Sequence, residues 1–345
     1  MTELIPLQIM GDCWNNPTEF QEQINQHPPG EPLELDLRNE APCLKELGIT
    51  DVLNTWVANR KISPDQVHLH RWTNPVEYVP YKRIRPFPKD QISLFFYMVR
   101  DFWQSWEPSL EQQLQYQRLF GLFVGRMTAS RAVILYQTNV LSDNIFTSRM
   151  KHVAPLPWIN QHEQKTLDNL SDWLCPKQQD EMFTWYSKDV IPSVDGKSVR
   201  DQFITPRSYI DTNTSLLQHY HKFAVEIVCE TYTYGDTFFP TEKTTRPIMA
   251  AKPMIVFGPQ YFLARLRSMG FRTYHDLWDE SYDLYQGPKR WNLMQKSMST
   301  LSDCSRVDQQ KILAKAHDIA IFNRNRLDDL SSYRVHLADH DYKKF

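Results

Sequence analysis

The sequence predicts an α/β protein made of two parallel-sheet halves and a helical C-terminal tail. Three observations support this fold class. Short apolar runs alternate with helical stretches over residues 4–72. The same alternation appears at residues 118–141 and again at 222–270, and the chain then reads as helical to its end. This order of strands and helices is typical of parallel sheets covered by helices.

The first half is expected to contain three strands and two helices. The strands are expected at residues 4–10, 32–37 and 65–72, and the helices at residues 16–27 and 43–60. Pro17 stands near the start of the first helix, a position that proline tolerates. This βαβαβ order predicts a parallel sheet with helices on both faces. The proline-rich residues 74–92 are interpreted as an ordered loop.

The second half begins with the apolar run at residues 118–126, which predicts a strand. A helix is expected over residues 127–141, with Thr128 as its N-cap. Further elements follow as strand, helix, strand and helix, at residues 222–231, 241–251, 252–258 and 259–270. The last helix has Pro259 in its first turn and Gly270 at its C-terminal cap.

Other stretches define the expected domain limits. Residues 92–118 read as mostly helical with a break at Pro108, whereas residues 150–222 show no clear pattern. The best amphipathic stretch after residue 270 is 308–327. These boundaries predict two Rossmann-like domains and a tail, at residues 1–112, 113–300 and 301–345.

The composition of the chain argues against several classes of protein. The net charge of −2 gives no broad positive surface for nucleic acid or an anionic membrane, although a local basic groove stays possible. The five cysteines are scattered without a CxxC motif, so neither a zinc site nor a disulfide framework is indicated. Free thiols fit a reducing cytoplasm. The N-terminus lacks a signal-peptide pattern and no stretch is apolar enough for a membrane span.

Charged residues gather at one edge of the second predicted sheet. They are Arg126 and Arg131 after its first strand, Glu230 after a later strand, and Thr241, Glu242 and Lys243 at the start of the following helix. A helix N-terminus with nearby cations suits a phosphate or diphosphate, and carboxylates can accept hydrogen bonds from ribose or sugar hydroxyls. The joint pattern predicts a nucleotide-sugar site. Taken singly, these residues are more often a helix cap and surface arginines. Pro247 requires that this helix either kinks or is very short.

A family resemblance rests on the same residues. The segment VEIVCETYTYGDTFFPTEKTTRPIMAAKPMIVFG resembles the nucleotide-binding segment of α-1,3-fucosyltransferase-like glycosyltransferases. Related uncharacterised phage and bacterial proteins share the Thr-Glu-Lys-Thr motif. The resemblance covers residues 119–141 and 223–283. This chain has Thr231 and Tyr232 where the fucosyltransferases usually have Asn-Ser, so the resemblance does not name the donor sugar.

The resemblance implies an α/β fold of the GT-B type, with two Rossmann-like domains facing across a cleft. It implies that Arg126 and Lys243 bind the donor diphosphate, with Arg131 as a weaker candidate. Glu242 would then bind the ribose, and Glu230 would lie beside the donor sugar. The implied co-substrate is a nucleotide sugar and the implied acceptor is a glycan or another hydroxyl compound, with no metal or other cofactor required for the transfer.

An inverting transferase also needs a carboxylate base in its N-terminal half, to take the proton of the acceptor. Asp12, after the first strand, and Glu77, after the third, are the candidates, and His70 is a third. A lone histidine in a strand is more often structural. The acids of residues 278–283 could suggest a metal site, but they read better as a helix start or a solvated face.

Two other functions stay open. A phage-type glycosyltransferase acting on DNA bases would need a basic stripe, for which residues 81–89 are the one candidate. A non-catalytic module of the same fold would bind a nucleotide or partner without turnover.

Overall fold

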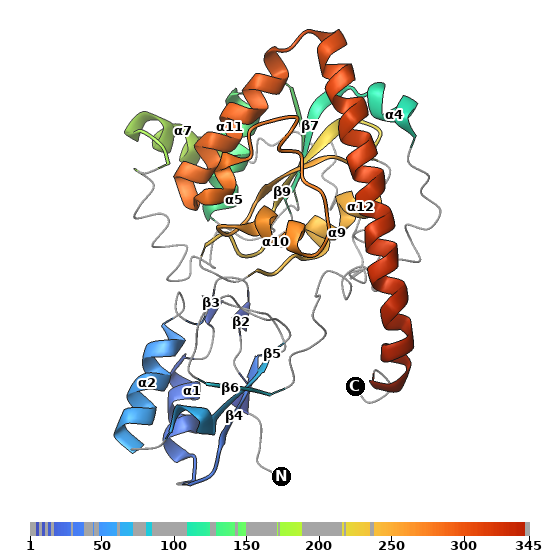
Figure 1. The fold of residues 1–345 in the computed structure, drawn as a ribbon. Helices are drawn as coiled ribbons and strands as arrows, with labels where there is room; N and C mark the ends of the chain where they lie inside the picture. Colours follow the sequence, from blue (N-terminus) through green and yellow to red (C-terminus); the bar gives the residue numbers. More distant parts are fainter. Residues whose placement is uncertain are drawn as a thin grey trace, which may run out of the picture. The chain divides into compact units, whose positions relative to one another are not determined.

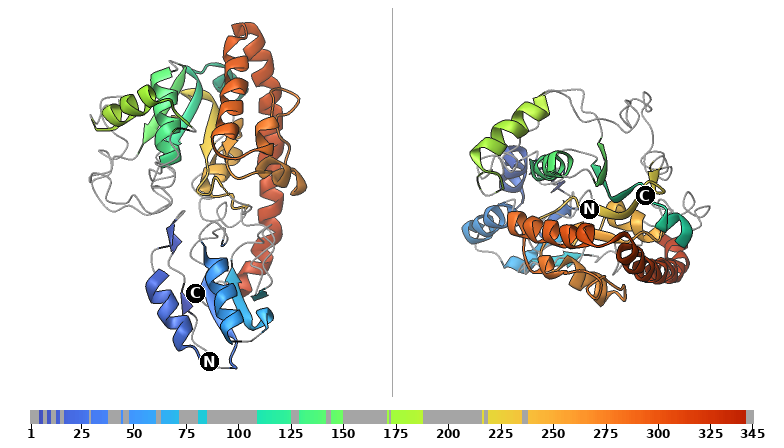
Figure 2. Two further views of the ribbon diagram at one scale, coloured as in Figure 1. Left: turned by 90° about the vertical axis from the view of Figure 1, so that its left-hand side faces the viewer. Right: turned by 90° about the horizontal axis from the view of Figure 1, so that it is seen from above.

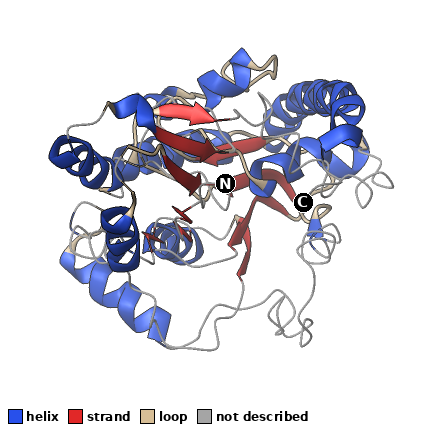
Figure 3. Cartoon of the chain, turned by 90° about the horizontal axis from the view of Figure 1, so that it is seen from below, coloured by secondary structure: helices blue, strands red, loops and turns tan. Residues whose placement is uncertain are grey.

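The computed structural model of this chain is a mixed α/β structure with parallel sheets (Figures 1 and 3). It divides into two compact units, Met1–Gln91 with Thr231–Pro240, and Ile92–Glu230 with Thr241–Phe345. The domain limits expected from the sequence stay predictions. The structure describes residues 5–6, 9–10, 13–14, 17–28, 30–37, 44, 48–60, 63–71, 81–84, 109–124, 129–141, 144–149, 171, 173–187, 216, 219–234 and 238–341.

The sheet of the first unit has parallel strands in the order β1-β4-β5-β6. Their bounds are β1 Ile5–Pro6, β4 Leu33–Leu37, β5 Val67–Arg71 and β6 Lys82–Ile84. Two further short strands, β2 (Ile9–Met10) and β3 (Cys13–Trp14), form an antiparallel pair. The three expected strands are confirmed in part or in full. Strand β6 lies where the sequence predicted a loop, because three residues are too few to give a strand pattern.

Helices α1 (Pro17–Gln26) and α2 (Ile49–Arg60) contact one another and lie on the same side of this sheet (Figure 1). For the helices that the structure describes in this unit, the expected covering of both faces is therefore wrong. Crossovers between parallel strands are right-handed, and strands added in one direction place successive crossover helices on one face.

The core of the first unit forms between these helices and the sheet. Phe20 and Ile24 of α1 and Leu53 and Trp56 of α2 are buried there. The indole Nε1 of Trp56 donates a hydrogen bond to the carbonyl oxygen of Ile24 at 2.7 Å. A buried indole needs such an acceptor, so this contact also fixes α2 against α1.

The sheet of the second unit is also parallel, with the strand order β10-β9-β7-β8. Its strands are β7 Arg118–Val124, β8 Ile145–Arg149, β9 Phe223–Cys229 and β10 Met254–Phe257. Strands β7, β9 and β10 confirm the sequence prediction, whereas β8 lies where no element was expected. Every residue of β9 is buried, as is typical of a strand covered on both faces.

Helices cover both faces of this second sheet. Helix α5 (Ala129–Leu141) links β7 to β8, and α9 (Glu242–Met249) links β9 to β10 and packs on α12 (Arg306–Asp341). Figure 2 shows α5 in green on one side of the sheet and α12 in red on the other. The connection through α5 leads from β7 to β8 at one end of the strand order, and the connection through α9 leads from β9 to β10 at the other end. The strand order therefore reverses between β7 and β9, the place where open α/β sheets bind ligands.

Further described helices lie before β7, between β8 and β9, and after β10, where the chain is helical as expected. They are α4 Leu110–Leu114, α7 Pro176–Ser187, α10 Phe262–Ser268, the 3-10 helix η4 Ser281–Leu284 and α11 Gly287–Asp303. Gly270 has a φ of 89° just after the end of α10, which confirms it as a terminating glycine. Pro259 does not lie in the first turn of α10, which begins at Phe262. Among the described helices, none has the length and apolar character needed to cross a membrane.

Helix α9 resolves the question raised by its internal proline. It contains Pro247 and ends at Met249 after 8 residues, so it is short. Proline has no N–H for the helical ladder, and its ring crowds the preceding turn. The amide of Lys252 then bonds back to the carbonyl of Pro247 at 2.8 Å, which turns the chain into β10.

Candidate functional site

The candidate site lies at the carboxyl edge of the second sheet, where Glu230 follows β9 and Thr241 precedes α9. Glu230 is fully buried. Its carboxylate accepts hydrogen bonds from the Thr241 amide at 3.0 Å, the Thr241 hydroxyl at 2.6 Å and the Thr244 hydroxyl. A buried carboxylate needs such donors, and the positive end of a helix stabilises it further. Glu230 thereby joins the end of β9 to the start of α9.

Thr241 is the N-cap of α9. Its backbone is extended, and its hydroxyl accepts a hydrogen bond from the Lys243 amide at 3.3 Å. This is the N-cap geometry that threonine favours, so the sequence prediction of a cap is confirmed. The same hydroxyl therefore serves both the helix and Glu230.

Lys243 and Glu242 form an ion pair on the first turn of α9. Lys243 Nζ lies 2.6 Å from Glu242 Oε1 and 3.2 Å from Thr241 Oγ1. The two charged side chains keep 15% and 17% of their surface exposed. They are therefore held in place yet reachable from solvent, as residues that contact a ligand must be.

Arg131 reaches the same edge from α5. It is buried, and its Nη2 donates to the carbonyl oxygens of Glu230 at 2.7 Å and Cys229 at 3.3 Å. Its guanidinium thus fastens the end of β9 to α5. The structure brings Arg131, Glu230, Thr241, Glu242 and Lys243 together at one edge.

Other predicted site residues lie outside the described residues. These are Arg126, Asp12 and Glu77. In the sequence, Arg126 comes two positions after the last residue of β7. The backbone of His70 belongs to β5 and pairs with Asp36 of β4. The roles of these residues stay predictions.

Sequence reasoning missed a buried ion pair beneath this edge. Arg246 of α9 lies 2.6 Å from Glu226 of β9, and its Nε donates to the Tyr220 hydroxyl at 2.8 Å. The Tyr220 hydroxyl in turn donates to Glu226. A glutamate inside the apolar run FAVEIVC was the signal, since a buried acid requires a partner. The pair fixes α9 to β9 a second time.

The charges of this pair are set by burial and proximity. Burial raises the pKa of Glu226, although Arg246 and Tyr220 oppose the shift. For Arg246 burial alone would lower the pKa, but the adjacent Glu226 raises it above its usual value. Arg246 is therefore a permanent cation, and it also lies over the ring of Phe123 at 5.2 Å.

Lys252 is buried at the opposite, amino edge of the sheet. Its Nζ donates to Gln113 Oε1 at 2.6 Å and to the Phe223 carbonyl at 2.9 Å. Burial lowers its pKa from 10.5 to about 7. A small cavity of about 10 Å³ lies beside it, with His317 in its wall. That space accommodates about one water molecule, so it is too small for a nucleotide.

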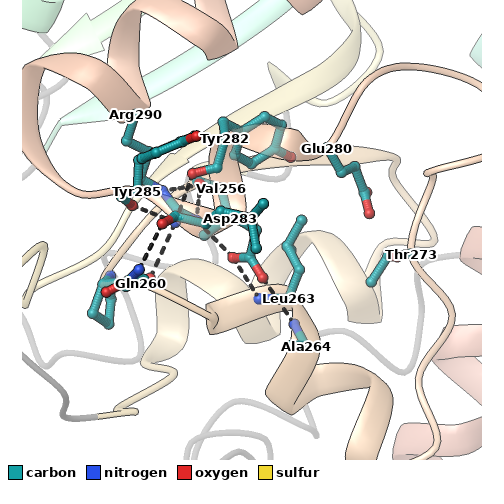
Figure 4. Close-up of polar contacts among 12 residues, drawn as sticks. Val256, Gln260, Leu263, Ala264, Thr273, Glu280, Tyr282, Asp283, Tyr285 and Arg290 are labelled. Atoms are coloured by element: carbon teal, nitrogen blue, oxygen red, sulfur yellow. Dashed lines mark hydrogen bonds and ion pairs between the residues drawn. The ribbon is translucent and has the colours of Figure 1, made fainter.

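The acids of residues 278–283 stand at a helix start, as the sequence indicated, because Glu280 is the N-cap of η4 and Asp283 lies in its first turn. Asp279 is exposed, whereas Glu280 and Asp283 are buried, so a solvated face describes Asp279 alone. Asp283 is buried, and its two oxygens accept the amides of Leu263 at 2.9 Å and Ala264 at 3.0 Å, which caps α10 (Figure 4). Arg290 pairs with Asp283 at 3.1 Å and is fully buried. Burial lowers the pKa of Arg290, and Asp283 opposes that shift. This tertiary cap explains why α10 begins after Pro259.

Comparisons of the chain with protein-family models, with curated proteins and with solved structures found no match. Among the described residues, no group of three or more histidine, cysteine or acidic side chains is placed to bind a metal ion.

Proposed function

We propose that this protein is a glycosyltransferase that moves a sugar from a nucleotide-sugar donor to an acceptor hydroxyl. One observation carries the proposal. Glu230 anchors the start of α9 beside the point where the strand order reverses, and this leaves the Lys243–Glu242 pair partly exposed there. Open α/β sheets bind nucleotides at that point, with phosphates near a helix start.

Each charged group has a distinct role in this proposal. The Lys243 ammonium contacts the donor diphosphate, and Arg126, two positions after β7 in the sequence, is the second cation that contacts it. The Glu242 carboxylate accepts hydrogen bonds from the ribose. Glu230 and Arg131 hold the edge rigid, since both are buried in contacts with the backbone of α9 and β9.

The transfer itself follows from these roles. The acceptor oxygen forms a bond to the anomeric carbon of the donor, and the bond from that carbon to the phosphate oxygen breaks. The acceptor proton passes to a carboxylate of the first unit, for which Glu77 and Asp12 are the candidates. Negative charge grows on the departing diphosphate, where Lys243 and Arg126 stabilise it. The proposal includes a GT-B arrangement of the two units.

The test is the affinity of the full chain for nucleoside diphosphates, measured by calorimetry with GDP, UDP, ADP, CDP and dTDP. Lys243→Met should weaken binding of the preferred nucleotide by roughly 10- to 150-fold, the effect of one charge-assisted hydrogen bond. Lys311→Met is the matched control, because Lys311 also pairs with a first-turn acid, Asp308, at 3.0 Å. Helix α12 starts beside α4 at the amino edge, where no nucleotide is expected.

The outcomes separate the functions. Binding that depends on Lys243, with release of nucleotide from a nucleotide sugar, supports the transferase. Binding without turnover on any acceptor supports the non-catalytic module. Salt-dependent binding to DNA supports the DNA-base transferase. No binding of any nucleotide refutes all nucleotide-dependent functions of this edge.

A further inference from the structure

Tyr261, just before α10, has an unusual backbone and an exposed ring. Its φ of 62° and ψ of 22° lie in the left-handed region, which glycine and asparagine favour. In the described part of the chain, Ala251 is the other non-glycine residue with positive φ. The Tyr261 side chain is 48% exposed. A tyrosine in this conformation is strained, and its ring gains little from packing in return.

Neighbouring contacts hold this conformation. The Tyr261 amide donates to the Asp283 carbonyl at 2.7 Å, and its own carbonyl accepts the Arg265 amide at 3.1 Å. Next to it, Gln260 Nε2 donates to the Leu284 carbonyl at 2.6 Å. The segment after β10 is thus bonded directly to η4 at the strained residue and at the residue before it.

Arg290 completes this support (Figure 4). Its guanidinium donates to the carbonyl oxygens of Val256 at 2.9 Å, Pro259 at 3.1 Å and Tyr282 at 3.3 Å, in addition to its pair with Asp283. A fully buried cation therefore joins β10, the loop after it and η4. Rigid support of this kind is what holds a binding side chain in a fixed orientation.

Tyr261 lies at the same sheet edge as the candidate site. The Glu230 amide donates to the Phe257 carbonyl at 2.9 Å, so the ends of β9 and β10 are side by side. Tyr261 comes four positions after Phe257 in the chain, and such a segment spans at most roughly 14 Å. Tyr261 therefore follows the end of β10 on the same carboxyl edge at which Glu230 anchors α9.

We propose that the Tyr261 ring stacks on the nucleobase of the donor nucleotide. This inference rests on the proposed function, because it assigns the base end of the nucleotide whose diphosphate Lys243 binds. An aromatic face binds any base by stacking, and an exposed ring with a rigid backbone does so at low entropic cost. The strain at Tyr261 then serves to present the ring to the ligand.

The experiment compares Tyr261→Asn with the wild type in binding the preferred nucleoside diphosphate and inorganic pyrophosphate. Asparagine accepts the left-handed conformation but removes the ring. We expect nucleotide affinity to fall about 5- to 150-fold, as for loss of one base stack, with pyrophosphate affinity unchanged. The melting temperature should stay equal or rise. Tyr261→Phe and Tyr261→Trp should keep nucleotide affinity, and Tyr261→Leu should lose it as asparagine does.

Ala251→Gly is the matched control, because it relieves positive φ at the opposite edge of the sheet and should leave nucleotide binding unchanged. If the wild type binds nucleotide and Tyr261→Asn and Tyr261→Leu bind it equally well, the stacking role is refuted while the proposed function stands. An equal loss of pyrophosphate binding would also refute it. A wild type that binds no nucleotide refutes the proposed function itself.

Discussion

The hydroxyl of Thr241 lies 2.6 Å from a carboxylate oxygen of Glu230, and this contact joins the start of α9 to the end of β9. Glu230 is buried, so its charge acts on the helix start rather than on solvent. This contact therefore also fixes the backbone position of Glu242 and Lys243, which follow Thr241 on the first turn of α9.

Removing the Thr241 hydroxyl should destabilise the second unit. Thr241→Val deletes an N-cap and leaves Glu230 with one donor fewer, so we expect a loss of about 1–3 kcal/mol in the free energy of unfolding. Thr241→Ser keeps the hydroxyl and should lose much less. Urea unfolding of both variants measures the difference. Equal losses for serine and valine would show that the hydroxyl is not the cause.

The buried ion pair of Arg246 and Glu226 should be costly to break from one side. Arg246→Met leaves the Glu226 carboxylate buried without its cation, for an expected loss of about 3–5 kcal/mol. The double variant Arg246→Met with Glu226→Gln should recover part of that loss, because the uncompensated charge is gone. Thermal and urea unfolding give both values. Additive losses in the double variant would contradict this account.

Stability should depend on pH through Lys252. Below pH 7 the amine is protonated in both folded and unfolded states, and the folded protein bears the full cost of a buried charge. Between the folded pKa of about 7 and the ordinary value of 10.5, the unfolded state holds more protons, so raising the pH stabilises the fold. Relative to Lys252→Met, the wild type should gain up to about 1.4 kcal/mol per pH unit across this range.

Urea unfolding at pH 6, 7, 8 and 9 tests this dependence, with Lys311→Met as the control for loss of an exposed lysine. A difference between wild type and Lys252→Met that stays constant from pH 6 to 9 would rule out titration of Lys252 as its origin.

Arg290 should not tolerate a lysine. Its planar guanidinium reaches several backbone carbonyls and Asp283 at once, and an ammonium group cannot match that geometry. We expect Arg290→Lys to lower the free energy of unfolding by about 2–4 kcal/mol, since carbonyls around it lose their donor. Lys289→Arg, at the neighbouring exposed position, should be nearly neutral. Differential scanning calorimetry of the two variants checks the contrast.

A glycine should be required at position 121, because the Phe223 ring of the adjacent strand leaves no space for a side chain. A Cβ at this position of β7 would overlap the ring of Phe223 on β9. Gly121→Ala should therefore cost about 1–3 kcal/mol through overpacking. Phe223→Leu in the same chain should relieve part of that cost. If the alanine variant unfolds like the wild type, the close approach of the two strands is wrong.

Much of the second unit could be predicted from the sequence. Continuous apolar runs gave β7, β9 and β10, and the Thr-Glu-Lys motif gave the start of α9, because both signals are local in the chain. Strands β6 and β8 were not predicted, since each is short and is flanked by polar or proline-rich sequence. The ion pairs Arg246–Glu226 and Arg290–Asp283 were not predicted either, because their members meet only after folding.

The sequence by itself determined the α/β class, the parallel strands and the clustering of charged residues at one sheet edge, because periodicity and chain order encode these features. Only the tertiary structure decided which of those charges are buried supports and which stay partly exposed. Glu230 and Arg131 became supports because backbone and hydroxyl groups surround them, whereas Lys243 and Glu242 stayed accessible on the first turn of α9. Burial depends on distant segments meeting in space, and no local pattern encodes that.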